Sequence, residues 1–224
     1  FLVSFLALHV GFPIVLGLAG VVKEGQPAPA WIFTVRLLMQ WSLMATIFWP
    51  LLRGVTWEQW KAHTGWRCPR GVAREIGAGL VGYGATLPAL FLAAIVVVVY
   101  MLLKQAANPD AAPPSNPVTE LLGGTSGLDL LLLFGMMTVW APIVEETFFR
   151  GILFRQLRGA MGVIAAAALS GLWFGLMHGY SGLLLMPVVT IGVCFAFIRE
   201  WRGSLVPTVV AHAMHNFAIG ALAI

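Results

Sequence analysis

Long apolar runs separated by short polar stretches set the pattern of this chain. A helix that spans a lipid bilayer needs about 20 predominantly apolar residues, and several runs reach that length. The pattern therefore predicts an all-α fold, a polytopic membrane helix bundle with about seven transmembrane helices. The predicted spans are residues 1–22, 31–52, 77–103, 128–158, 161–180, 182–198 and 204–224.

Two polar stretches connect these spans in the first half of the chain. In residues 53–76, Thr56 and Gln59 have the spacing of a capping box, and Trp57 and Trp60 follow on one face. This arrangement predicts an amphipathic helix that lies on the membrane surface. Residues 104–127 are rich in Pro, Gly, Asn and Ser and have no periodicity, so they predict an irregular loop.

The composition agrees with a membrane protein. Of the 224 residues, 59% are hydrophobic and only 10% are charged, whereas soluble domains have about 25% charged residues. The two cysteines, Cys68 and Cys194, lie in unlike surroundings, so no disulfide is predicted. The chain begins with Phe1 rather than Met, and we therefore expect its natural N-terminus to lie further upstream.

The distribution of Lys and Arg predicts the sidedness. The net charge is +4, which reflects basic loops rather than a surface for nucleic acid. Loops with several Lys or Arg residues alternate with nearly neutral loops along the whole chain. The basic loops are therefore predicted to be cytoplasmic. Short loops and small size favour an integral protein of a prokaryotic cell membrane.

Three polar clusters interrupt the apolar runs of the second half. Ionisable side chains at membrane depth are costly, and they indicate a functional site by default. A carboxylate, two imidazoles and an amide that met at one depth would form a site able to activate water. The clusters are Glu145–Glu146 with Arg150, Phe174 with His178, and His212 with Asn216.

Helical spacing assigns different directions to the two carboxylates. Residues four apart share a helix face, so Glu146 and Arg150 are predicted to form an ion pair. The adjacent Glu145 then faces other helices. Two alternatives stay open from the residues alone. The acidic cluster could touch headgroups at a helix end, and the imidazoles could be hydrogen-bonding partners between helices.

Zinc is a further alternative. Glu145, His178 and His212 are ligand types that could form a zinc site with one open position. A His-Glu-x-x-His motif and a Gly-x-Ser-x-Gly elbow are both absent from the sequence. The residues therefore leave open whether a water would be activated by zinc or without a cofactor.

Taken together, the three clusters resemble the CPBP family, the CAAX-protease and bacteriocin-processing proteins related to type II CAAX prenyl endopeptidase. The family pattern is Glu-Glu-x-x-x-Arg, then Phe-x-x-x-His, then His-x-x-x-Asn, and this chain has all three in that order. The resemblance implies a catalytic core over about residues 128–224. This core would belong to a single transmembrane domain, residues 1–224, in which residues 1–127 supply N-terminal helices and loops.

The resemblance also implies a glutamic-type intramembrane endopeptidase. Glu145 would act as the general base on a water, assisted by His178, while His212 and Asn216 would stabilise the oxyanion. The supporting residues would be Glu146, Arg150 and Phe174. In this form no cofactor is expected. The family has also been described as metal-dependent, and zinc would then be bound by Glu145, His178 and His212.

The expected partners are the lipid bilayer and a membrane peptide or the C-terminal tail of a protein, with no nucleic acid. The enzyme would cut a membrane-embedded or lipid-modified peptide near its C-terminus. A prenylated CAAX tail, a bacteriocin and a sorting-signal helix are the candidate substrates. The alternative function is a non-catalytic membrane binding or bacteriocin-immunity protein. A small transporter ranks last, because the chain lacks the repeated halves of such folds.

Overall fold

The computed structural model describes residues 15, 20, 47–109, 127–178, 180 and 182–223. Every regular element in these ranges is a helix, which confirms the predicted all-α membrane bundle. The chain divides into two units, Phe1–Trp60 and Lys61–Ile224, and each is described by itself. Of the predicted spans 1–22 and 31–52, the structure describes residues 15, 20 and 47–52, of which 47–52 are helical, and the rest lies outside the described residues.

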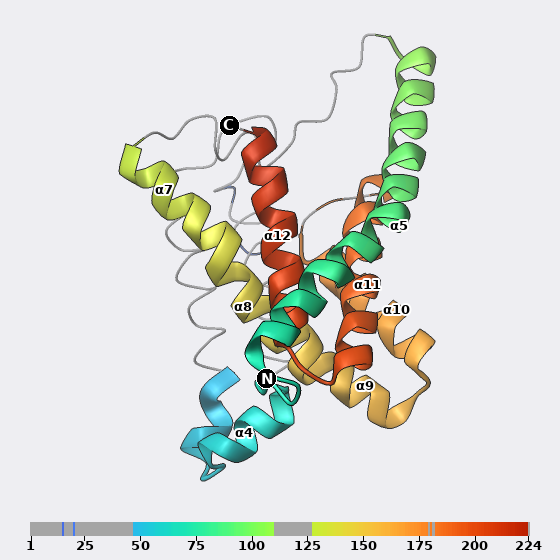
Figure 1. The fold of residues 1–224 in the computed structure, drawn as a ribbon. Coiled ribbons are helices and arrows are strands. Elements are labelled where there is room, and N and C mark those ends of the chain that lie inside the picture. Colours follow the sequence, from blue (N-terminus) through green and yellow to red (C-terminus); the bar gives the residue numbers. More distant parts are fainter. Residues whose placement is uncertain are drawn as a thin grey trace. The chain divides into compact units, whose positions relative to one another are not determined.

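The remaining predicted spans are helical. Two π-helical segments, η2 and η3, join α7, α8 and α9 into one continuous helix, and a short 3₁₀ segment, η4, leads into α11 (Figure 1). The elements are α4 (Trp57–Thr64), α5 (Val72–Ala107), α7 (Gly127–Gly135), η2 (Met136–Trp140), α8 (Ala141–Glu146), η3 (Thr147–Leu153), α9 (Phe154–Ala160), α10 (Val163–Leu176), η4 (Gly182–Leu185), α11 (Met186–Arg202) and α12 (Val206–Ala223).

Four of the described helical stretches are long and apolar enough to cross a membrane. They are Val72–Ala107, Leu130–Ala160, Gly182–Arg202 and Val206–Ala223. The apolar α10, Val163–Leu176, is shorter. The continuation of the fourth predicted span beyond Glu145 and Glu146 is confirmed, since the chain stays helical as far as Ala160. The carboxylates are therefore inside a span rather than at its end.

The polar stretch before α5 contains the predicted helix start. The Thr56 N–H donates to Gln59 Oε1 at 2.9 Å, and the Gln59 N–H donates to Thr56 Oγ1 at 3.2 Å. This reciprocal pair confirms the capping box that begins α4. The helix itself is short, Trp57–Thr64, and does not fill residues 53–76.

Both predicted limits of the next span were too narrow. Helix α5 already begins at Val72, after Gly71 with a positive φ of 91°, and the first turn is held by the ion-paired Glu75. Helix α5 then continues to Ala107, so the predicted loop does not start at residue 104. Lys, Gln and Ala are strong helix formers, and they extend the helix until Asn108. The rest of that loop, residues 110–126, lies outside the described residues.

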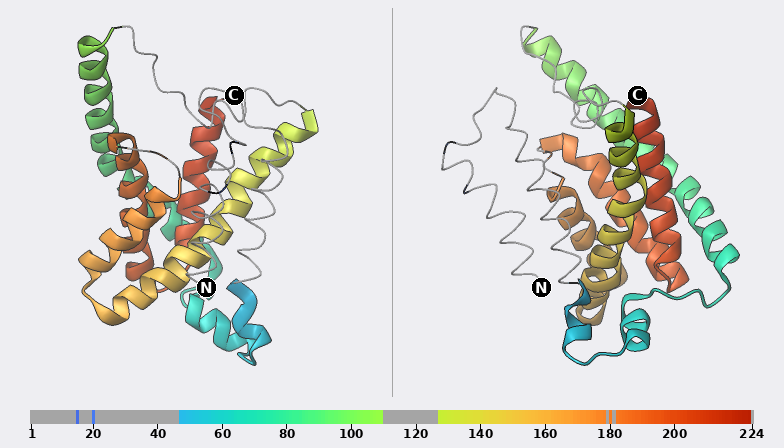
Figure 2. Two further views of the ribbon diagram at one scale, coloured as in Figure 1. Left: turned by 180° about the vertical axis from the view of Figure 1, so that it is seen from behind. Right: turned by 90° about the vertical axis from the view of Figure 1, so that its left-hand side faces the viewer.

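Close helix packing positions the residues of the second unit. Helix α12 lies between α5 and the continuous α7–α9 helix, and α10 packs along α11 (Figures 1 and 2). Small residues allow the close contact between α10 and α11. A Cβ atom added to Gly171 would lie 2.7 Å from the backbone nitrogen of Val193, and one added to Gly192 would lie 2.8 Å from the Cα of Gly171. The backbones of α10 and α11 therefore meet next to Phe174.

Candidate active site

A buried ion pair lies at the centre of the candidate site. Arg150 Nη1 and Glu146 Oε1 are 3.0 Å apart, and both side chains are fully buried. The predicted intrahelical pair is therefore confirmed. Arg150 Nη2 also donates to the backbone carbonyl of Gly192 at 2.8 Å, which ties η3 to α11. Two acceptors therefore hold the guanidinium between the helices, while the buried Arg150 Nε has no hydrogen-bond partner among the described residues.

Aromatic rings surround the same guanidinium. Its central carbon lies 4.4 Å from the ring centroid of Phe174, 5.7 Å from that of Phe149 and 5.6 Å from that of Phe195. These contacts are within the range of cation–π attraction, which is stronger in a desolvated setting. The sequence pattern included Phe174 but not Phe149, Phe195 or Gly192, since no motif marks these three residues.

His212 of α12 uses its two ring nitrogens on two different carboxylates. Its side chain is 3% exposed, and Nδ1 lies 2.9 Å from Glu146 Oε1. A carboxylate that is paired with Arg150 accepts, so Nδ1 is the donor. The other nitrogen, Nε2, lies 3.8 Å from Glu145 Oε2. Glu146 therefore orients the imidazole so that Nε2 faces Glu145.

His178 lies just after α10, in a turn. The predicted helix 161–180 is wrong here, because α10 ends at Leu176. The Phe174 carbonyl, which would accept the His178 N–H in a continuing helix, accepts His178 Nδ1 at 2.7 Å instead. The His178 N–H donates to the Gly175 carbonyl at 3.0 Å. This exchange of hydrogen bonds ends the helix and aims Nε2 at Glu145 Oε2, 4.0 Å away.

Glu145 thus lies near both imidazoles. A carbonyl or a carboxylate holds each Nδ1–H, so in the neutral rings both Nε2 atoms are acceptors, as is the Glu145 carboxylate. Three acceptors around one point suit a hydrogen-bond donor such as water. A water could lie about 2.8 Å from both Glu145 Oε2 and one of the Nε2 atoms. Because these two acceptors are 3.8 or 4.0 Å apart, the two hydrogen bonds of that water would make an angle of about 90°. The Glu145 side chain is 20% exposed and can meet such a molecule.

Asn216 is placed differently from this group. Its side-chain Nδ2 donates to the Met137 carbonyl in η2 at 2.8 Å. Among the described residues, no hydrogen bond joins Asn216 to Glu145, His178 or His212. One N–H of the amide is used on η2, and no hydrogen bond of the second N–H is found within the described ranges. The neighbouring His215 faces α5, where its ring meets Tyr83 edge-on with centroids 6.0 Å apart.

The zinc alternative can be compared with these distances. Zinc bonds of about 2.0–2.2 Å in a tetrahedron place neighbouring donors about 3.4 Å apart. Here the Nε2 atoms of His212 and His178 are 3.8 and 4.0 Å from Glu145 Oε2. Within the described ranges, no three His, Cys, Asp or Glu side chains form a group suited to a metal ion. The donor types fit zinc, but the spacing in this conformation does not.

Residues 127–218 match the protein family described as type II CAAX prenyl endopeptidase Rce1-like. The match includes all three polar clusters, from Glu145 to Asn216. It confirms the resemblance that was drawn from those clusters. No curated protein and no solved structure matches the chain. The family and the apolar helices together indicate a membrane-embedded peptide hydrolase of the CAAX-protease type.

Proposed function

Because residues 127–218 match the Rce1-like family of type II CAAX prenyl endopeptidases, we propose that this chain is an intramembrane endopeptidase whose attacking water is activated by Glu145. One observation carries the assignment of roles. Glu145 Oε2 lies 3.8 Å from His212 Nε2 and 4.0 Å from His178 Nε2. Since both Nδ1 atoms are already bound, the reactive nitrogens are held toward the carboxylate.

The proposed reaction begins with a water hydrogen-bonded to Glu145 Oε2 and His178 Nε2. Glu145 accepts one proton as the water oxygen bonds to the carbonyl carbon of the scissile peptide. The carbonyl oxygen then carries the negative charge of the tetrahedral intermediate. When the carbon–nitrogen bond breaks, the proton held by Glu145 passes to the leaving nitrogen, with His178 as the relay. The products are an acid and an amine, and Glu145 is again ionised.

The oxyanion is stabilised by donors on α12. Asn216 donates its second amide N–H, since the first is used on the Met137 carbonyl. His212 can donate from Nε2 only when both of its ring nitrogens carry a proton. Glu146, at 2.9 Å from Nδ1, is placed to stabilise that charged imidazole. Arg150 and Phe174 act through Glu146 and His178, because they hold these two side chains in position.

The substrate is proposed to be a peptide that reaches the site through the membrane. The reacting side chains are carried by apolar helices, α8 and α12, and by the turn after α10. A lipid-modified C-terminal tail, such as the prenylated tail in the family's description, can enter this environment with its prenyl chain in the bilayer. A membrane-embedded helix that ends near the site is the second substrate type of the same class.

The test uses purified protein in liposomes with two synthetic substrates, a farnesylated CAAX peptide and a transmembrane peptide. Products are identified by mass spectrometry. We expect Glu145→Gln to lower turnover by about 10²–10⁴-fold, the usual contribution of a general base. Glu58→Gln, an exposed carboxylate on α4, is the matched control and should cut at the wild-type rate. Equal rates for Glu145→Gln and the control would remove Glu145 from the mechanism. No cleavage of either substrate by the wild type would favour a non-catalytic binding protein.

A further inference from the structure

The end of α4, the beginning of α5, the end of α11 and the beginning of α12 meet at one end of the second unit. The Leu205 N–H donates to the Gly65 carbonyl at 2.9 Å, and Ser204 Oγ donates to the Arg67 carbonyl at 2.7 Å. These bonds attach the segment before α5 to the turn between α11 and α12. Gly203, with a left-handed φ of 66°, makes that turn possible. Arg155 of α9 joins the same segment by donating to the carbonyls of Ala62 and His63.

Two acidic side chains at this end, Glu75 and Glu200, are neutralised by arginine. Glu75 is fully buried and accepts from Arg202 Nε and Nη2, each at 3.0 Å. Glu200 accepts from Arg158 at 2.9 Å. The partners of these two carboxylates are Arg158 and Arg202, so the positive charges of Arg70, Arg74 and Arg155 are not cancelled by them.

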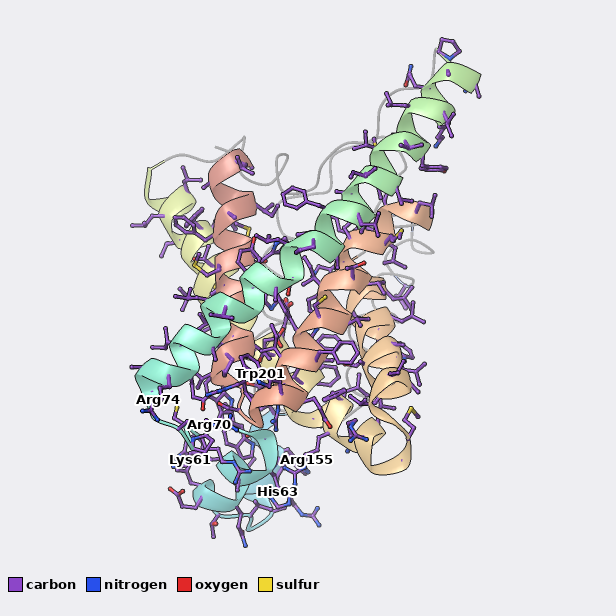
Figure 3. The ribbon with its side chains drawn as sticks, turned by 45° about the vertical axis from the view of Figure 1, so that its right-hand side comes forward. Lys61, His63, Arg70, Arg74, Arg155 and Trp201 are labelled. Carbon is purple, nitrogen blue, oxygen red and sulfur yellow. The ribbon has the colours of Figure 1, made fainter. Side chains whose placement is uncertain are left out.

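Several of these basic side chains gather with a tryptophan on the surface. Arg70 and Arg74 are exposed, and neither has a hydrogen bond or ion pair within the described part of the chain. Trp201, at the end of α11, is 55% exposed. We call this group the basic rim: Lys61, His63, Arg70, Arg74, Arg155 and Trp201, all at the same end of the helices (Figure 3).

We propose that the basic rim binds the headgroups of anionic phospholipids. Two observations favour a lipid partner. Helix α5 has no charged residue from Ile76 until Lys104, and Arg74 lies two residues before this apolar stretch. The basic rim therefore lies where the apolar part of the span begins. An exposed Trp beside Arg is typical of the interface between headgroups and acyl chains. A partner at that level that carries negative charge and an apolar tail is an anionic lipid.

The free arginines set the strength of this binding. Each Lys or Arg near an anionic membrane surface contributes about 1 kcal/mol, so replacing two of them weakens binding by about 30-fold. The attraction is screened by salt, because the Debye length falls from about 10 Å at 0.1 M to about 3 Å at 1 M. An acidic protein segment would also respond to salt, but it would not need the apolar interface next to Trp201.

The experiment titrates phosphatidylglycerol or phosphatidylcholine into the purified chain in neutral detergent micelles. Bound lipids are counted by native mass spectrometry, and the Tm is followed by tryptophan fluorescence. We expect phosphatidylglycerol to bind and to raise the Tm of the wild type, and phosphatidylcholine to do neither. Arg70→Gln/Arg74→Gln should lower the apparent affinity for phosphatidylglycerol by about 30-fold. Arg70→Lys/Arg74→Lys keeps both charges and should bind nearly as the wild type does.

Lys104→Gln is the matched control, because it removes one cation from the opposite end of the same helix. Its affinity for phosphatidylglycerol should equal that of the wild type. Equal losses in Lys104→Gln and in the double Gln variant would overturn the proposal, since the effect would then be one of net charge. The proposal also fails if inorganic phosphate alone raises the Tm equally. Stabilisation by polyglutamate without any effect of phosphatidylglycerol would instead assign the rim to an acidic protein.

Discussion

The buried pair of Glu146 and Arg150 gives the sharpest quantitative prediction. Replacing Arg150 with Met removes the 3.0 Å ion pair and the 2.8 Å bond to the Gly192 carbonyl, and it leaves a fully buried carboxylate without its counter-charge. Breaking a buried pair in this way costs about 3–5 kcal/mol of unfolding free energy. Glu146→Gln leaves the buried guanidinium instead, so we expect a loss of similar size.

The double variant Glu146→Gln/Arg150→Met should be more stable than the two losses predict. It has no buried charge left at these positions, and removing both members of a buried pair is often nearly neutral. A coupling energy of at least about 2 kcal/mol is therefore expected, at the upper end of the values for residues in contact. Activity should stay low in all three variants, because Glu146 also accepts from His212 Nδ1.

The assay is reversible unfolding in mixed micelles with increasing dodecyl sulfate, followed by tryptophan fluorescence, with peptide cleavage measured on the same samples. Arg150→Lys separates charge from shape. It keeps a cation, but it cannot hold Glu146 and Gly192 with one planar group against Phe174. An intermediate stability is expected. If the losses in the two single variants simply add in the double variant, the pair does not act as a buried unit.

Three further predictions follow from the same contacts. Gly171→Ala should lower the free energy of unfolding by about 1–3 kcal/mol, because its Cβ atom would meet the Val193 backbone at 2.7 Å. Gly84 lies in open space, so Gly84→Ala should be neutral or stabilising, and thermal unfolding compares the two variants. Glu75→Gln should lower the free energy of unfolding by about 2–4 kcal/mol in the same assay, because Glu75 is buried against Arg202. The control Glu200→Gln affects an exposed pair with Arg158 and should lower it by at most about 1 kcal/mol. Dialysis against a strong chelator should leave peptide cleavage unchanged, given the wide spacing of the donors at Glu145; stoichiometric metal and loss of activity would contradict this.

The sequence predicts those features that depend on composition and local spacing. The apolar runs predict the helices from α5 to α12, and the spacing of four predicts the pair between Glu146 and Arg150. The capping box at Thr56 is equally local, since both partners lie within one turn. The family match over residues 127–218 follows from the same three clusters. The catalytic roles of these residues stay predictions.

Features that depend on how helices meet were not predictable. Glu75 pairs with Arg202, 127 residues later, and nothing in either local sequence indicates the other. The end of α10 before His178 depends on a side chain that takes the Phe174 carbonyl from the backbone. The π-helical segments on both sides of α8 are likewise invisible in an apolar pattern that fits an ordinary helix. None of these features changes the apolar pattern from which the helices were predicted.

The arrangement around His212 gives a physical reason for two adjacent carboxylates. Consecutive positions on a helix point about 100° apart, so Glu145 and Glu146 cannot lie on the same side of a neighbouring group. The two nitrogens of an imidazole also face different directions, and His212 meets Glu146 with Nδ1 and Glu145 with Nε2. One ring is therefore hydrogen-bonded to the carboxylate that Arg150 neutralises and faces the partly exposed carboxylate of Glu145 across 3.8 Å. Moving either carboxylate by one position would break this arrangement, so a single glutamate at residue 145 cannot replace the pair.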